Sequence, residues 1–198
     1  MTTKATPPFF MIRHGETDWN REKRYQGQVD IPLNRLGREQ AAGNGRLLAS
    51  LGHDWTQWRF FSSPLGRARD TMEILREQLG IDPKNYATDD RLIEITFGAW
   101  ERKRLEDLVE EEPEEMARRN ANKWVHAPPG GESYADAVKR VAAFLDHLEA
   151  PSVIICHGGI LRATQFIMED GDGPAIADTS VPQDKVYVFD GNRTFWTE

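Results

Sequence analysis

The stretch Phe9-Phe10-Met11-Ile12-Arg13-His14-Gly15 is the most informative part of this sequence for its fold. Four consecutive apolar residues are typical of a strand that is buried on both faces, as strands of mostly parallel sheets are. The run ends at Arg13 and His14, a cation and an imidazole. We therefore expect a buried strand whose carboxyl end carries a pair of chemically active side chains.

The same pattern recurs twice further along the chain. Val153-Ile154-Ile155-Cys156 is a second apolar run, and it ends at His157-Gly158-Gly159. A third strand is expected at about 58–61, where it leads through Ser62-Ser63-Pro64 into a helix that carries Arg67. Ligands of such sheets gather at the carboxyl ends of the strands, beside helix N-termini. Two histidines and two arginines at neighbouring strand ends would form a compact cationic pocket suited to a phosphoryl group.

Helical spacing of apolar residues connects these strands. Helices are expected from a cap at Asn34 to about residue 51, from near Pro64 to 79, from a cap at Ser133 to 148, and over 157–168. We also expect an extended segment at 91–95 and a terminal strand pair at 186–189 and 194–196. The charge-rich stretch 101–124 predicts short amphipathic helices, and residues 99–131 are a candidate lid. Repeated strand and helix units predict one three-layer α/β domain over 1–198, with a mostly parallel central sheet.

Composition limits the partners that this chain can have. With 25 Lys and Arg against 32 Asp and Glu in 198 residues, the net charge of −7 offers no global field for nucleic acid or an anionic membrane. No apolar run approaches the roughly 20 residues of a membrane span, and the N-terminal residues lack the pattern of a secretory signal. We expect a cytoplasmic protein, with the oligomeric state left open and a homodimer among the options.

The segment Arg13-His14-Gly15-Glu16-Thr17-Asp18-Trp19-Asn20 resembles the signature of the histidine phosphatase superfamily, also called the phosphoglycerate mutase-like family. Four further blocks follow in the family's order and extend the resemblance to about Arg162. They are Tyr25-Gln26-Gly27-Gln28-Val29-Asp30-Ile31-Pro32-Leu33 with Gly37, Ser62-Ser63-Pro64-Leu65-Gly66-Arg67-Ala68 with Thr71, Arg91-Leu92-Ile93-Glu94-Ile95 with Phe97-Gly98, and Gly130-Gly131-Glu132-Ser133 leading to His157-Gly158-Gly159.

The resemblance implies both an activity and the roles of individual residues. By it, His14 is the nucleophile that forms a phosphohistidine, and Glu94 gives and takes the proton. Arg13, Arg67 and His157 would hold the phosphoryl oxygens, and Asn20 and the backbone of Gly27 would help to bind the substrate. The resemblance implies a small phosphorylated metabolite as substrate, with no metal and no cofactor.

Departures from the family pattern favour a phosphatase over a phosphoglycerate mutase. The mutases usually carry Arg directly after the catalytic acid and Tyr before the Gly, where this chain has Ile95 and Phe97. They also usually have a longer insertion before the last catalytic histidine. Basic residues in the candidate lid keep the mutase as the alternative: Arg102, Lys103, Arg104, Arg118, Arg119 and Lys123. Many family phosphatases have Gly where this chain has Arg102, which argues against assigning any one substrate.

Three other interpretations compete with this one. The Cys156 to Arg162 spacing fits a cysteine-dependent phosphatase loop, with Cys156 as nucleophile, but it leaves Arg13, His14 and Arg67 unexplained. A metal site is disfavoured because no paired histidine spacing is present and two arginines would repel a cation. A binding module without turnover is disfavoured because all five residues assigned to catalysis are present.

Overall fold

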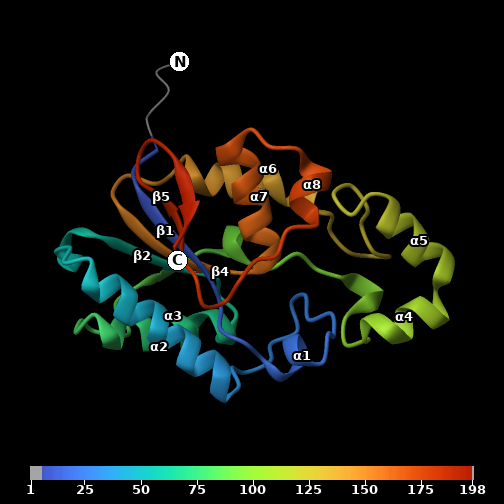
Figure 1. Cartoon of the computed structure of the whole chain (residues 1–198), viewed down its shortest axis with the longest axis horizontal. Helices are drawn as coiled ribbons and strands as arrows, with labels where there is room; N and C mark the ends of the chain where they lie inside the picture. The colour runs from blue at the N-terminus through green and yellow to red at the C-terminus, as the bar shows by residue number, and fades with distance from the viewer. Residues whose placement is uncertain (1–5, 198) are drawn as a thin grey trace.

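The computed structural model describes residues 6–197, in which a six-stranded sheet is enclosed by helices (Figure 1). The strand order is β3-β2-β4-β1-β5-β6. The strands are β1 (Phe9–Arg13), β2 (Arg59–Ser62), β3 (Ala87–Thr88), β4 (Ser152–Cys156), β5 (Tyr187–Phe189) and β6 (Thr194–Trp196). The first four are parallel to one another, whereas β5 and β6 are antiparallel to their neighbours. The predicted α/β class and the mostly parallel sheet are confirmed.

Alternate residues of the two central strands enter two separate cores. Phe9 and Met11 of β1 belong to the core that contains helices α6 (Tyr134–Leu145) and α7 (Gly158–Glu169). Phe10 and Ile12 belong to the core under helices α2 (Arg35–Ser50) and α3 (Gly66–Gln78). Figure 1 shows these two helix pairs on opposite faces of the sheet. The continuous apolar runs are therefore explained by burial on both faces of the strands.

The helix caps follow the expected chemistry in two cases. The side chain of Asn34 accepts a hydrogen bond from the Gly37 N–H, and the side chain of Ser133 accepts one from the Asp136 N–H. Such caps satisfy backbone donors that the first helical turn leaves unpaired. Pro64 lies just outside α3, whose N-cap is Leu65.

The expectation of an extended segment at 91–95 was wrong for Arg91 and Leu92, whereas Ile93 has an extended backbone. Asp90–Leu92 is a 3₁₀ turn, and the sheet ends at the two-residue strand β3 just before it. The backbone carbonyls of Arg91 and Ile93 accept hydrogen bonds from the Arg140 guanidinium, both at 2.7 Å. The Arg140 side chain thus supplies the hydrogen-bond donors that a neighbouring strand would otherwise supply to this segment.

Short helices occupy the stretch predicted to contain them. They are α4 (Leu105–Glu111) and α5 (Pro113–Ala121), the latter with Pro113 in its first turn. Figure 1 shows both standing apart from the sheet, on the side where β1 and β4 end. Two further short helices were not predicted, α1 (Asp18–Arg21) and α8 (Gly173–Ala177). Among the residues described, no helix has the length and apolar character needed to cross a membrane; residues 1–5, part of the segment examined for a secretory signal, lie outside them.

Candidate active site

Strand register brings the three reactive segments to one edge of the sheet. Arg13 pairs with Cys156 across β1 and β4, and Ser62 pairs with Ile155 across β2 and β4. The pairing continues past the strand ends, because the His14 N–H donates to the Cys156 carbonyl and the Ser63 N–H to the Ile155 carbonyl, both at 2.9 Å. The side chains that follow the three strands are therefore held together by main-chain hydrogen bonds.

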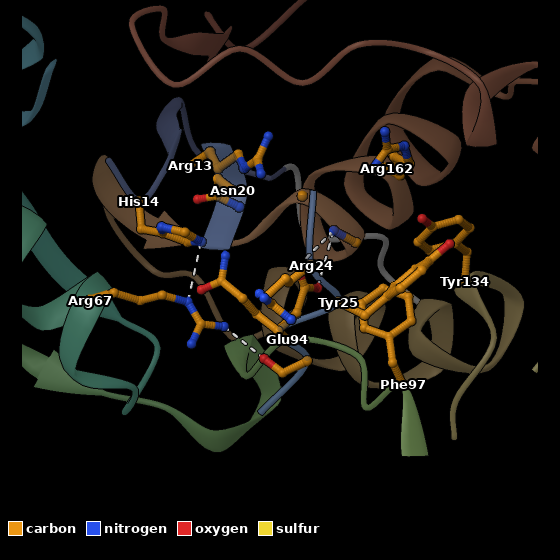
Figure 2. Close-up of a pocket in the computed structure, with 14 residues that line it drawn as sticks. Arg13, His14, Asn20, Arg24, Tyr25, Arg67, Glu94, Phe97, Tyr134 and Arg162 are labelled. Carbon is orange, nitrogen blue, oxygen red and sulfur yellow. Dashed lines mark hydrogen bonds between the residues drawn. The ribbon is translucent and has the colours of Figure 1, made fainter. Parts of the chain in front are cut away.

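The proton position on His14 follows from its two partners. Arg67 Nε lies 3.2 Å from His14 Nε2, and a guanidinium only donates, so Nε2 is the accepting nitrogen. The proton is then on Nδ1, which donates to the Gly15 carbonyl at 2.8 Å. Burial, together with the charges of Arg67 and Arg13, lowers the pKa of His14 well below its ordinary value. His14 is therefore a neutral imidazole whose Nε2 lone pair faces Arg67 (Figure 2).

His157 is a second neutral imidazole beside the first. The two ring centroids are 5.1 Å apart, and the His157 ring is fully buried. Its Nε2 lies 2.7 Å from the Ser63 hydroxyl, whereas its Nδ1 has no hydrogen-bond partner within residues 6–197. Burial is the main cause that lowers the pKa of His157 well below the ordinary value, and the charge of Arg67 adds to it.

Two arginines supply positive charge around His14. Arg67 is 1% exposed and is held by the carbonyls of Gly27 and Val29, at 2.7 and 2.8 Å. Arg13 donates to the Val181 carbonyl at 2.8 Å, and its buried Nε has no hydrogen-bond partner in the part of the chain that the structure describes. Burial lowers the pKa of both groups, that of Arg13 to about 10, which still leaves Arg13 charged at neutral pH.

Among the described residues that line this pocket, Glu94 is the one carboxylate. Its Oε1 accepts hydrogen bonds from the backbone N–H groups of Ile95 and Gly159, at 3.0 and 3.1 Å. Its Oε2 has only a longer contact with the Gly159 N–H, at 3.3 Å. A Cβ atom at Gly159 would lie 2.5 Å from Oε1, so the carboxylate position requires glycine there. The geometry leaves Oε2 as the freer oxygen for proton exchange.

Asn20 and Gly27 also line the pocket, as expected, and the structure adds detail to both. Asn20 belongs to α1, where it completes a capping box with Thr17. Gly27 has a φ of +51°, and a Cβ there would lie 2.1 Å from the Glu101 carboxylate. The Gly27 carbonyl is engaged by Arg67. The structure therefore shows Gly27 supporting a cation, in addition to lining the pocket.

The pocket is small and its two sides differ. Its volume is about 160 Å³. Arg13, His14 and Arg67 lie on one side in Figure 2, and aromatic rings with Arg162 lie on the other. The sequence did not identify this second side as a wall of the pocket; its labelled members are Tyr25, Phe97, Tyr134 and Arg162.

The competing cysteine mechanism is not supported by the geometry. Cys156 is fully buried as the last residue of β4 and does not line the pocket. Burial raises the pKa of its thiol well above the ordinary value, which disfavours the reactive thiolate. Arg162 does line the pocket, but it donates to the Thr179 carbonyl at 2.7 Å.

Most basic side chains of the candidate lid are paired with acidic ones. Lys103, Arg104, Arg118 and Lys123 each form an ion pair with a carboxylate. Arg119 differs, because it is 5% exposed and its guanidinium carbon lies 5.7–5.9 Å from the centroids of four rings. Three of these rings line the pocket and the fourth is Trp100.

Residues 9–197 match the histidine phosphatase superfamily (branch 1). The chain belongs to this superfamily. It is 38% identical over 155 residues to a probable phosphoglycerate mutase GpmB from Salmonella paratyphi C, a match that covers 75% of this chain and 68% of that protein. The match confirms the family resemblance found in the sequence.

Two solved structures of similar proteins are phosphatases by their descriptions. A mycobacterial glucosyl-3-phosphoglycerate phosphatase in complex with VO3 superposes with a TM-score of 0.79 at 27% identity, over 96% of each chain. A putative alpha-ribazole-5'-P phosphatase from Escherichia coli gives 0.78 at 27% identity, over 97% of this chain and 94% of the other. The family and these neighbours support a histidine-dependent enzyme of the phosphatase and mutase type.

Proposed function

We propose that this protein hydrolyses phosphomonoesters of small metabolites through a phosphohistidine at His14. The observation that carries the proposal is the environment of His14: a neutral ring whose Nε2 carries no proton, accepts a hydrogen bond from Arg67 and feels the charge of Arg13 as well. A neutral imidazole is a nucleophile, and guanidinium groups match phosphoryl oxygens. The pocket volume of about 160 Å³ suits a small leaving group, since pockets for drug-sized ligands usually hold roughly 300 Å³ or more.

The reaction follows from these positions in two steps. His14 Nε2 attacks phosphorus, so that the N–P bond forms while the P–O ester bond breaks, and Glu94 gives its proton to the leaving oxygen. Water then attacks phosphorus, Glu94 takes a proton from it, and the N–P bond breaks to release phosphate. Arg13 and Arg67 stabilise the charge on the equatorial oxygens in both steps. His157 is fully buried and is not among the residues that line the pocket. With the Ser63 hydroxyl donating a hydrogen bond to its Nε2, its Nδ1 would carry a proton and could serve as a further donor to a phosphoryl oxygen.

Water, rather than a second acceptor, is the expected recipient of the phosphoryl group. Ile95, at the position where the mutases carry Arg, is 1% exposed and packs in the core. Phe97 lines the pocket with an apolar ring. The pocket therefore lacks at these two positions the polar groups that would retain a phosphoglycerate.

Arg119 is the observation that favours the alternative, a phosphoglycerate mutase. It is a buried lid cation for which no carboxylate lies within ion-pair distance among residues 6–197, and it adjoins the aromatic wall. The 38% identity to a probable phosphoglycerate mutase points the same way. A binding module without turnover is the third outcome to be tested.

A substrate panel separates these functions. Phosphate release and isomerisation are measured without added metal across metabolite phosphomonoesters that include 3-phosphoglycerate, with wild type and His14→Ala. The proposal expects phosphate release from one or a few esters and none from the variant. Isomerisation with little release would make the protein a mutase, and phosphate binding without turnover of any ester would make it a binding module.

A further inference from the structure

Gln183 connects the segments that form the pocket, although it lies in the loop between α8 and β5. Its Nε2 donates to the His14 carbonyl at 3.0 Å and to the Asn20 Oδ1 at 3.1 Å. Its own backbone carbonyl accepts a hydrogen bond from Asn44 Nδ2 at 3.0 Å, and Asn44 is buried in α2. The loop is thus fixed to α2, and its side chain bridges the end of β1 and α1.

Backbone groups determine which way both amides face. A carbonyl only accepts, so the Gln183 atom beside the His14 carbonyl must be the donating Nε2. The Thr17 N–H only donates, and it lies 3.1 Å from Asn20 Oδ1, so that atom must be the oxygen.

Three donors therefore converge on one oxygen of Asn20. They are the Thr17 N–H at 3.1 Å, the Thr17 hydroxyl at 3.2 Å and Gln183 Nε2 at 3.1 Å. Asn20 lines the pocket (Figure 2), and its Nδ2 has no hydrogen-bond partner among the described residues. With Oδ1 saturated on the protein side, the two N–H bonds of Nδ2 are the part of Asn20 left for a ligand.

We infer that Gln183 is a positioning residue that holds Asn20 with its Nδ2 presented to a phosphoryl oxygen. The inference rests on the proposed function for the identity of the ligand, and it concerns a residue that does not itself contact the substrate. The second hydrogen bond of Gln183, to the His14 carbonyl, fixes the orientation of the Gln183 amide itself, so that Nε2 reaches Asn20 Oδ1.

The test uses inorganic phosphate as the probe and calorimetry as the readout, so that it does not depend on turnover. Gln183→Met keeps the length of the side chain and removes both hydrogen bonds. We expect the Kd for phosphate to rise about tenfold in Asn20→Ala, which loses a hydrogen bond to a charged group, and by a similar factor in Gln183→Met, which leaves that donor without its support. The double variant should bind no more weakly than Asn20→Ala alone, because the two residues act through one contact.

Gln40→Met is the matched control. Gln40 accepts a hydrogen bond from the neighbouring Glu16 N–H at 2.8 Å and does not touch Asn20. The control should lower the Tm as much as Gln183→Met does while leaving the Kd for phosphate unchanged. Equal weakening of phosphate binding in Gln40→Met and Gln183→Met would show a merely structural role and overturn the inference, as would additive effects in the double variant.

A measurement on the wild type keeps the inference testable if Gln183→Met fails to fold. The side-chain ¹⁵NH₂ resonance of Asn20, assigned by its loss in Asn20→Ala, should shift on phosphate addition as Nδ2 becomes a donor. An unshifted Asn20 resonance at saturating phosphate would overturn the inference. Phosphate could also bind, with the single and double variants behaving as expected, while no ester is turned over. That outcome would contradict the proposed function and leave the inference about Gln183 standing.

Discussion

Arg67 Nε donates to His14 Nε2 at 3.2 Å, and this contact decides the chemistry of the pocket. It forces the imidazole proton onto Nδ1, where the Gly15 carbonyl accepts it at 2.8 Å. A phosphoryl group entering between Arg67 and His14 would take over the guanidinium donor and meet the freed lone pair. The same arginine thus fixes the tautomer of His14 and, in the proposed function, would bind the phosphoryl oxygens of the substrate.

The neutral state of the two buried histidines makes stability depend on pH. In the folded protein the pKa values of His14 and His157 lie well below 6.5, whereas in the unfolded chain both groups take up a proton below that pH. The unfolded state binds more protons there, so the free energy of unfolding falls as pH drops below about 6.5 by up to about 2.7 kcal/mol per pH unit. Urea denaturation between pH 7 and 5.5 measures this slope. A His14→Asn, His157→Asn double variant should show a clearly smaller slope, and an unchanged slope would contradict the assignment.

Glu94→Gln should affect esters according to their leaving groups. Glutamine can keep the hydrogen bonds from Ile95 and Gly159 through its oxygen, but it has no proton to give. Alkyl phosphates should slow by about 10²–10⁴, the usual contribution of general acid catalysis, and 4-nitrophenyl phosphate by much less. Single-turnover rates of phosphoenzyme formation measure both. Equal slowing of the two esters would remove Glu94 from the role of acid.

Arg102→Gly should stabilise the protein. Arg102 has a φ of +77°, in the left-handed region that costs a non-glycine residue roughly 1–2 kcal/mol, at the position where many phosphatases of the family have Gly. After the entropy cost of glycine in the unfolded chain, we expect a gain of about 0.5–1 kcal/mol in the free energy of unfolding. Urea denaturation of both proteins measures the gain. Arg102→Ala is the control, because alanine keeps the strained φ and loses only the side chain. A gain in the alanine variant equal to that in the glycine variant would show that the charge, and not the backbone, is the cause.

Cys156→Ser should keep turnover and lose stability. The thiol is fully buried and lies 3.8 Å from the His157 carbonyl, beyond the reach of an O–H···O bond, so a hydroxyl in its place is a buried polar group without that partner and costs about 1–3 kcal/mol. Activity and the free energy of unfolding are measured on the same preparation. Loss of turnover in a folded Cys156→Ser protein would revive the cysteine mechanism.

The sequence predicted the two central strands well because burial on both faces leaves a simple apolar signal, whereas the exposed two-residue strand β3 was not predicted. Phe9 to Ile12 and Val153 to Cys156 are found where they were expected, and His14, Arg67 and His157 meet as parallel pairing requires. Asn34 and Ser133 were correct as caps, since their chemistry is local. The roles of these site residues stay predictions until phosphoryl transfer is measured.

Long-range side-chain contacts account for what the sequence did not predict. The segment 91–95 has the composition of a strand. Its carbonyls at Arg91 and Ile93 instead accept hydrogen bonds from Arg140, which lies on a helix some 50 positions away in the chain. Gln183 lies in a polar loop with no periodicity and reaches His14 and Asn20 from the far end of the sequence. Neither contact has a local signature, because both depend on how the finished sheet arranges distant segments.

The measurement that tests the central claim most directly is the location of covalent phosphate during turnover. The enzyme is quenched in alkali with a substrate from the panel, digested and mapped by mass spectrometry, beside His14→Ala and Cys156→Ser. Our account predicts an acid-labile, alkali-stable phosphate on the peptide that contains His14, present in Cys156→Ser and absent in His14→Ala. Phosphate on Cys156, or wild-type turnover by a His14→Ala protein, would contradict it.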